Sequence, residues 1–160
     1  AGPLAARQGQ LGCKVYFMST SSNSEGPAYT ASQGSMLLSL DWQSESRVVA
    51  VFGCGGCRDK GKRPLMGAAA GQYADLTVLT SDNPRTEDPL AIIRDILPGL
   101  SGPHLVIPDR REAIFRALDL ARPGDTVILC GKGHETTQET GGHRLPMDER
   151  QIIAEYINGS

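Results

Sequence analysis

Glycines and charged side chains gather in three short parts of the sequence, which we call the first segment (residues 53–64), the second segment (81–89) and the third segment (131–135). Each follows a short apolar run typical of a buried strand. Arginine, lysine and carboxylate groups brought together favour a small ligand that carries charges of both signs. These three segments are therefore the candidate site.

The first segment holds four glycines, two arginines and two lysines within twelve residues. Glycines let backbone N–H groups approach an anion closely, and a following helix N-terminus adds positive potential. The segment does not end in Gly-Lys-Ser/Thr, and no phosphate-binding P-loop motif occurs elsewhere in the chain. The pattern favours binding of a carboxylate or a phosphate over a glycine turn with solvated basic residues.

The second segment places an arginine next to a proline. Pro84 biases Asn83 toward an extended backbone, which aims Arg85 in a fixed direction. A guanidinium held in this way can bind a carboxylate through two parallel hydrogen bonds. Asp82 can accept an ammonium group. The alternative for this segment is a capped turn without a ligand.

The third segment combines glycines with Lys132, His134 and Glu135. No Ser or Cys nucleophile stands in register with His134, so this histidine is expected to fix loop geometry rather than to act as a general base. Glu135 is the better candidate for contact with an ammonium group. A fourth segment, residues 108–111, also follows a strand pattern and is interpreted as a helix N-cap with a solvated basic turn. His104 and His143 are expected at the surface.

Strand and helix patterns alternate from residue 47 onward, with short connections. This alternation predicts a Rossmann-like α/β fold, with a mostly parallel sheet and helices on both faces. In such a sheet, loops that follow strands meet at the carboxyl edge, where ligands bind. The expected strands span residues 14–18, 48–52, 76–80, 105–107 and 126–130.

Helix starts and one turn are also marked in the sequence. Pro64 suits the first turn of a helix that runs to about Tyr73, with Leu65, Ala69 and Tyr73 on one face. Three further helices are expected after the N-cap residues Asp88, Asp109 and Asp148. Gly141-Gly142 marks a hairpin or loop tip. Residues 1–46 are Ser/Gly-rich and set apart from the domain expected at 47–160, although a short helix from Met36 is predicted within them.

Bulk properties exclude several classes of function. The chain has 160 residues and a net charge of -2, so no global basic field indicates nucleic-acid binding. No apolar run is long enough to span a bilayer, and no signal segment is recognised at the start, so a cytoplasmic protein is expected. The spacing of Cys54 and Cys57 fits half of a zinc site or a redox pair, but a crowded turn is the preferred interpretation, and no metal site is expected.

Four motifs together resemble one protein family. They are VFGCGG (residues 51–56), RDKGKRPLM (58–66), TSDNPR (80–85) and GKGHE (131–135). The resemblance is to the C-terminal domain of MurE-type Mur ligases, and it covers about residues 47–157. These enzymes add the third residue of the peptidoglycan stem peptide to UDP-N-acetylmuramoyl-L-alanyl-D-glutamate. The motif Asp-Asn-Pro-Arg is typical of members that select meso-diaminopimelate rather than L-lysine.

The resemblance implies a role for individual residues. Arg85 would bind the distal carboxylate of diaminopimelate, and Arg58 would bind the other carboxylate. The residues implied to complete the distal end of the site are Asp82, Asn83, Pro84, Gly131 and Glu135. Lys60, Lys62 and His134 are expected to support the loops. No catalytic residue is assigned within this chain.

The resemblance also implies ATP and Mg²⁺ for the whole enzyme, bound mainly by Mur ligase domains that this chain lacks. ATP would phosphorylate the glutamate carboxylate, and an amino group of diaminopimelate would then attack it. The chain alone is therefore expected to be inactive, with the other Mur ligase domains as partners. The expected location is the bacterial cytoplasm, with the plastid stroma as the alternative.

The chain departs from the family pattern in specific places. An Asp-Tyr-Ala-His-Thr-Pro segment expected before the second strand is not found, and Cys57 stands where the family usually has Asp. Two other functions remain as alternatives to the ligase domain. One is a non-catalytic Mur-like binding module, and the other is a thiol redox protein that uses Cys54 and Cys57.

Overall fold

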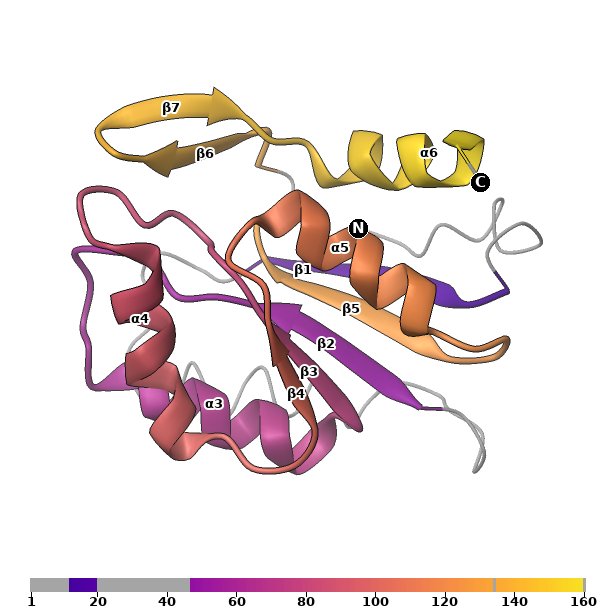
Figure 1. Cartoon of the computed structure of the whole chain (residues 1–160), viewed down its shortest axis with the longest axis horizontal. Helices are drawn as coiled ribbons and strands as arrows, with labels where there is room; N and C mark the ends of the chain where they lie inside the picture. The colour runs from indigo at the N-terminus through magenta and orange to yellow at the C-terminus, as the bar shows by residue number, and fades with distance from the viewer. Residues whose placement is uncertain (1–11, 20–46, 134, 160) are drawn as a thin grey trace.

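A parallel sheet forms the centre of the computed structural model, which describes residues 12–19, 47–133 and 135–159 (Figure 1). Its strand order is β1-β5-β2-β3-β4, and every neighbouring pair is parallel. The strands are β1 (Lys14–Ser19), β2 (Val48–Phe52), β3 (Leu76–Leu79), β4 (His104–Val106) and β5 (Thr126–Gly131). The fold class predicted from the sequence is confirmed.

The two central strands are buried along their whole length. β2 lies between β3 and β5, and both β2 and β5 are continuous runs of buried residues, as expected where helices cover both faces of a sheet. β1 pairs with β5 from Lys14 to Ser19, so a strand from the Ser/Gly-rich part of the chain extends the same sheet. The domain boundary expected at residue 47 stays a prediction. The helix expected from Met36 lies outside the described residues.

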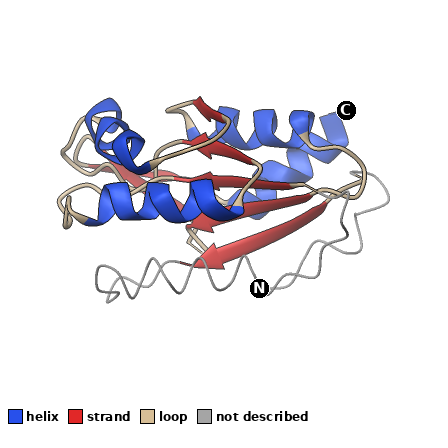
Figure 2. Cartoon of the chain, turned by 90° about the horizontal axis from the view of Figure 1, so that it is seen from below, coloured by secondary structure: helices blue, strands red, loops and turns tan. Residues whose placement is uncertain are grey.

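Helices of the described residues cover both faces of the sheet (Figures 1 and 2). α3 (Lys62–Tyr73) and α4 (Pro89–Ile96) lie on one face, and α5 (Arg110–Leu120) and α6 (Glu149–Gly159) lie on the other. A 3-10 turn, η2 (Leu97–Gly99), follows α4. The N-caps are confirmed: the Asp88 carboxylate accepts the N–H of Leu90, and the Asp109 carboxylate accepts the N–H of Glu112.

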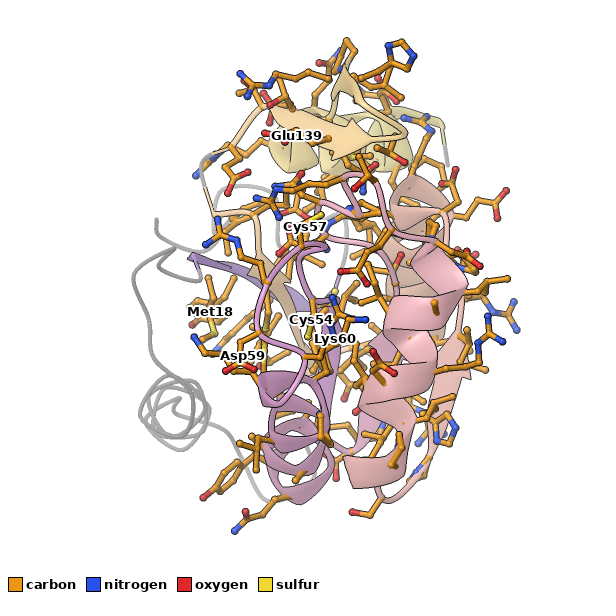
Figure 3. All side chains as sticks on the ribbon, turned by 90° about the vertical axis from the view of Figure 1, so that its left-hand side faces the viewer. Met18, Cys54, Cys57, Asp59, Lys60 and Glu139 are labelled. Atoms are coloured by element: carbon orange, nitrogen blue, oxygen red, sulfur yellow. The ribbon has the colours of Figure 1, made fainter. Side chains whose placement is uncertain are left out.

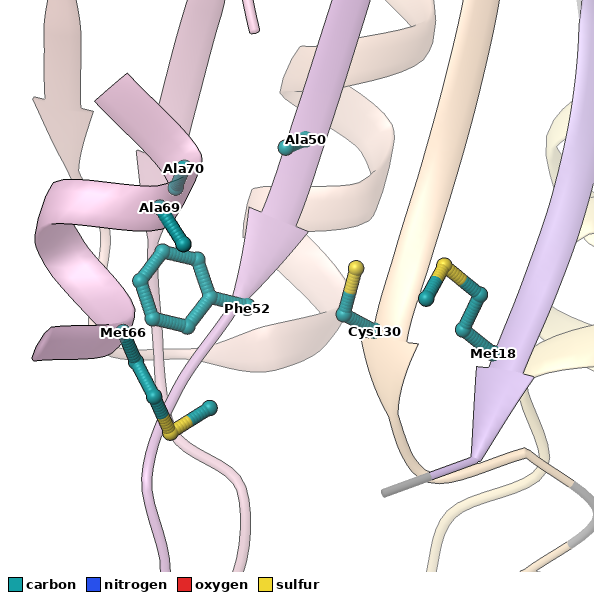
Figure 4. A pocket seen from close by; sticks show the side chains of 7 residues that line it. All are labelled: Met18, Ala50, Phe52, Met66, Ala69, Ala70 and Cys130. Atoms are coloured by element: carbon teal, nitrogen blue, oxygen red, sulfur yellow. The ribbon is translucent and has the colours of Figure 1, made fainter. Parts of the chain in front are cut away.

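The buried face of α3 differs from the apolar face expected from its sequence. Leu65 is 42% exposed, whereas Arg63, Met66, Gly67 and Ala70 are buried. The reason is close packing against α4, because a Cβ on Gly67 would lie 2.6 Å from the carbonyl oxygen of Ile96. Figure 4 shows a small apolar hollow between α3 and the sheet, lined by Met18, Ala50, Phe52, Met66, Ala69, Ala70 and Cys130.

A two-stranded hairpin follows the third segment and lies next to the second. β6 (Thr137–Thr140) pairs antiparallel with β7 (His143–Pro146). The turn between them is made by Gly141 and Gly142, which have φ angles of 58° and 78°. Glycine adopts such angles without strain, so the hairpin suggested by Gly141-Gly142 is confirmed. A bridge between Arg85 and Thr140 joins the hairpin to the second segment.

The three candidate segments meet at the carboxyl edge of the sheet. The first follows β2, the second follows β3, and the third begins at Gly131, the last residue of β5. Strands β2, β3 and β4 follow one another in chain order to one side of the sheet, whereas β5 returns to the other side of β2. Open α/β sheets bind ligands at the carboxyl edge where the strand order reverses in this way.

Candidate functional site

Glycines bring the first and second segments into backbone contact. A Cβ on Gly53 would lie 2.2 Å from the carbonyl oxygen of Thr80, and one on Gly56 would lie 1.8 Å from that of Pro84. The N–H of Gly56 donates to the carbonyl oxygen of Asn83 at 2.7 Å. At these positions the glycines serve loop packing, which differs from the anion approach suggested by the sequence.

Arg58 and Arg85 border the same glycine. A Cβ on Gly55 would lie 2.9 Å from Nη1 of Arg85 and 3.3 Å from Cγ of Arg58. Nη1 of Arg85 donates to the carbonyl oxygen of Gly56 at 2.9 Å, which lays the guanidinium along the first segment. Arg58 is exposed. The structure therefore brings the two arginines that the sequence singled out to one place.

The hairpin, and not only Pro84, sets the direction of Arg85. Arg85 has a φ of 57°, in the left-handed region that L-residues rarely adopt. Its N–H donates to the carbonyl oxygen of Glu139 at 2.9 Å, and its carbonyl oxygen accepts the N–H of Gly141 at 2.7 Å. The Glu139 carboxylate lies 3.6 Å from Nε of Arg85 and 3.0 Å from Nη2 of Arg144.

A hollow of about 380 Å³ lies between the hairpin and the first two segments. Figure 3 shows Glu139 on the hairpin and Cys57 on the first segment, which both line this space. The other lining residues are Arg85, Thr86, Gly142, His143 and Arg144. Guanidinium groups and a carboxylate face the same volume, which suits a ligand that carries both charges.

Lys132 is a central residue of the site, although the sequence assigned it no role. It is 0% exposed, and its Nζ donates to Oδ1 of Asn83 and to the carbonyl oxygen of Thr137. The carboxylates of Asp82 and Glu135 lie 3.6 and 3.7 Å away. Burial lowers the pKa of Lys132, and the two carboxylates oppose that shift. The signal available in the sequence was a lysine close behind the mostly apolar strand pattern of residues 126–130.

The remaining predicted positions fall around this lysine. Asp82, Asn83 and Pro84 are buried, Gly131 ends β5, and Glu135 is exposed. Oε2 of Glu135 lies 3.4 Å from Nδ2 of Asn83. His134 lies outside the described residues. His104 and His143 are exposed, as expected.

Arg63 is a buried structural residue that links the first segment to the second segment and to α4. Its guanidinium, 1% exposed, binds the Glu87 carboxylate at 3.0 Å, the Asp95 carboxylate at 2.8 Å and the carbonyl oxygen of Gly55 at 3.0 Å. Glu87 also accepts the N–H of Cys57 at 2.7 Å. These contacts, first those with Arg63, lower the pKa of Glu87 to about 2.

Two lysines expected to support the first segment lie at the start of α3. The backbone N–H of Arg63 donates to the carbonyl oxygen of Lys60 at 3.1 Å, and the N–H of Lys62 lies 3.3 Å from the carbonyl oxygen of Asp59. Lys60 is exposed and Lys62 is half-buried. Their main chains therefore form the turn that leads into α3.

The solvated basic turn expected at residues 108–111 is wrong for Arg110. This side chain is 1% exposed, and its Nε lies 2.9 Å from the Glu149 carboxylate. Its two terminal nitrogens donate to the carbonyl oxygens of Ser81 and Cys130, at 2.9 and 3.0 Å. Arg110 thus joins the starts of the second and third segments to α6. Its partner carboxylate comes from a distant part of the sequence, so the residues around Arg110 do not predict this contact.

The two cysteines of the Cys-x-x-Cys pattern lie in different surroundings. Cys54 is buried with its Sγ 3.5 Å from Sδ of Met66, and burial raises its pKa to about 12. Cys57 is exposed, and hydrogen bonds with Thr86 lower its pKa. A buried, protonated thiol is a poor nucleophile, so the pair does not resemble a reactive dithiol.

The part of the chain that the structure describes contains neither a metal-binding cluster nor a membrane-spanning helix. Within residues 12–19, 47–133 and 135–159, no three His, Cys, Asp or Glu side chains are grouped so that they could hold a metal ion. In the same part of the chain, no helix has the length and apolar character that crossing a bilayer requires.

Known ligases are similar to this chain in sequence. A UDP-N-acetylmuramoyl-L-alanyl-D-glutamate--2,6-diaminopimelate ligase from Caldanaerobacter subterraneus is 54% identical over 114 residues, which are 69% of this chain and 24% of that protein. A ligase of the same name from Aquifex aeolicus is 51% identical over 118 residues, 72% of this chain and 24% of that protein. The chain spans about a quarter of the length of these curated relatives.

Solved structures give the same result for the fold. A structure of a ligase with that name superposes with a TM-score of 0.76 at 38% identity, and the match covers 92% of this chain and 29% of that one. Escherichia coli FolC in complex with ADP, 16% identical, has a TM-score of 0.59 over 92% of this chain and 30% of that one, which supports the fold alone. The family model described as "Mur ligase, glutamate ligase domain" matches residues 27–133. Because this match covers most of the chain, the chain belongs to the Mur ligase family.

Proposed function

We propose that this chain is the amino-acid-binding domain of an ATP-dependent ligase that adds meso-diaminopimelate to UDP-N-acetylmuramoyl-L-alanyl-D-glutamate. The observation that carries this proposal is the position of Arg58 and Arg85 against the same glycine, Gly55. The carboxylates of Asp82 and Glu135 stand nearby around Lys132. Relatives about half identical to the chain carry the name of this ligase.

The charges of diaminopimelate match those of the site. The amino acid has a carboxylate and an ammonium group at each end. In this proposal Arg85 binds the distal carboxylate, Arg58 binds the other, and Glu135 and Asp82 receive the distal ammonium group. Asn83, Pro84 and the backbone at Gly131 shape the distal end. L-Lysine lacks the distal carboxylate and would leave Arg85 without its ligand partner. An unpaired polar group in a site discriminates between ligands more strongly than a missing methylene does.

ATP and Mg²⁺ belong mainly to other domains in this proposal. The sequence has no P-loop, and the described residues offer no carboxylate cluster suited to a metal ion. Bound ATP would supply activation of the glutamate carboxylate. The residues of this chain would bind and orient the amino acid that is joined to it. A cytoplasmic location is part of the proposal, and the bacterial relatives offer no support for a plastid one.

Calorimetry and a chimeric ligase test the proposal. Calorimetry measures binding of meso-diaminopimelate and L-lysine to this chain. The chimera joins residues 47–160 to the remainder of the Aquifex aeolicus ligase, and its product formation is measured with both amino acids. Loss of a charged hydrogen bond costs about 1.5–3 kcal/mol, so Arg85→Ala should raise the Kd or KM for meso-diaminopimelate roughly ten- to a hundredfold.

The matched control is Arg116→Ala, which removes an exposed arginine from α5 and should change neither value. A chimera that prefers L-lysine, or one that Arg85→Ala leaves unchanged, would overturn the proposal. Binding of meso-diaminopimelate by the chain together with an inactive chimera would favour the non-catalytic binding module instead.

A further inference from the structure

Among the described residues, the polar contacts of the Lys132 ammonium group come from the second segment, the third segment and the start of the hairpin. Nζ lies 2.5 Å from Oδ1 of Asn83, 3.0 Å from the carbonyl oxygen of Thr137, and within 4 Å of Asp82 and Glu135. The buried pair of Arg110 and Glu149 also acts on it electrostatically. A buried ammonium group is costly unless it is paired, so these partners determine where Lys132 lies, and it in turn determines where they lie.

The contacts of Lys132 decide which way the Asn83 side chain faces. Its Oδ1 accepts two hydrogen bonds, from Nζ of Lys132 and from the N–H of Glu139 at 2.9 Å. Both partners are donors, so this atom must be the carbonyl oxygen of the carboxamide. Nδ2 then points toward Glu135, at 3.4 Å. Asn83 therefore presents N–H donors, and not an acceptor, to the side of the site that Glu135 borders.

Lys132 also sets the charge at this end of the site. Asp82 and Glu135 are two carboxylates, and Lys132 is the cation placed between them. With Lys132 protonated, the group has one net negative charge, which suits a single ammonium group. Without that cation, the group would carry two negative charges, and like charges at short range repel each other.

We propose that Lys132 is a positioning residue that fixes Asn83 as a hydrogen-bond donor and leaves one net negative charge at the ammonium end of the amino-acid site. This inference rests on the proposed function for the identity of the ligand. The orientation of Asn83 can be measured without any ligand.

The first test follows the side-chain NH₂ signals of Asn83 by ¹⁵N-¹H NMR, assigned by their loss in Asn83→Ala. In the wild-type chain these signals should shift with the deprotonation of Lys132, with a midpoint below the ordinary lysine value of 10.5. Lys132→Met should move the signals toward those of exposed asparagine, and Lys132→Arg should move them less. The control Lys14→Met removes an exposed lysine from β1 and should leave them unchanged. Asn83 signals that follow neither the titration nor Lys132→Met would overturn the inference, whatever the ligand proves to be.

The second test measures the Kd for meso-diaminopimelate by calorimetry. Lys132→Met should weaken binding at least tenfold, with partial recovery in Lys132→Arg and no change in Lys14→Met. Asn83→Asp keeps an acceptor for Lys132 but replaces the N–H donor on the ligand side, so it should also weaken binding at least tenfold. Wild-type affinity in Asn83→Asp would overturn the donor assignment. A wild-type chain that binds no diaminopimelate would count against the proposed function, and the NMR result would still decide the role of Lys132.

Discussion

Replacing Glu87 by glutamine tests how the first and second segments are held together. Glu87 accepts hydrogen bonds from the buried guanidinium of Arg63 and from the backbone N–H of Cys57. Glutamine keeps one acceptor oxygen and the approximate shape, but it loses the charge and the second acceptor. Arg63 would keep Asp95, at 2.8 Å, as its remaining carboxylate.

The size of the effect follows from the pKa of Glu87. A fall from 4.5 to about 2 corresponds to at most about 3–4 kcal/mol of stability when the carboxylate is ionised. The side chain is 21% exposed, so solvent screening reduces this contribution. We expect Glu87→Gln to lower the free energy of unfolding by about 1–2 kcal/mol at pH 7.

Urea unfolding of wild type and Glu87→Gln between pH 2 and pH 7 measures this difference. The folded pKa lies below the unfolded one, so the contribution is full above 4.5 and is lost as the pH falls toward 2. The two proteins should therefore converge in stability at acid pH. Glu112→Gln, an exposed change on α5, should stay within about 0.5 kcal/mol of wild type throughout. A Glu87→Gln difference that is absent at pH 7, or constant down to pH 2, would refute the reasoning.

Two other predictions concern the first segment. Gly56→Ala should lower the free energy of unfolding in urea by about 2–3 kcal/mol, because its Cβ would meet the carbonyl oxygen of Pro84 at 1.8 Å. The control Gly159→Ala, which has open space around it, should be close to neutral. Equal stabilities of the two variants would contradict the close packing of the two segments. Cys57 should react with iodoacetamide in the folded chain, because its pKa is lowered and it is exposed, while Cys54 and Cys130, with pKa values raised to about 12, should react only after unfolding. Peptide mass spectrometry over a time course checks this, and labelling of Cys54 as fast as Cys57 would be the contrary result.

Local chemistry made most of the fold predictable. Asp88 and Asp109 cap helices because their carboxylates meet N–H groups two and three residues later, and Gly141-Gly142 turns the hairpin because glycine tolerates positive φ. The apolar runs of β2 and β5 predicted buried strands. Each of these signals lies within a few residues of its effect.

The interior of the site was less predictable because its contacts are distant in sequence. Arg63 was grouped with residues favoured for anion binding and Arg110 was expected to be solvated, but their partners Glu87 and Glu149 lie 24 and 39 residues away. Lys132 reaches Asn83 across 49 residues. The residues that flank a basic side chain in the sequence are alike whether it faces solvent or a distant carboxylate. Only the folded structure distinguishes a solvated basic side chain from a paired one.

In the proposed amino-acid site, the left-handed backbone of Arg85 bears on how ligand preference changes. The two hydrogen bonds that fix this backbone, to Glu139 and from Gly141, involve main-chain atoms only. An exchange of the side chain at this position would therefore leave the path of the loop in place, so a new ligand preference does not require a new framework. The φ of 57° narrows the choice, because β-branched residues are strained there by about 1–2 kcal/mol, while asparagine, aspartate and glycine are accommodated more easily. Backbone geometry thus limits which side chains can replace Arg85, and through them which ligands the proposed site can come to prefer.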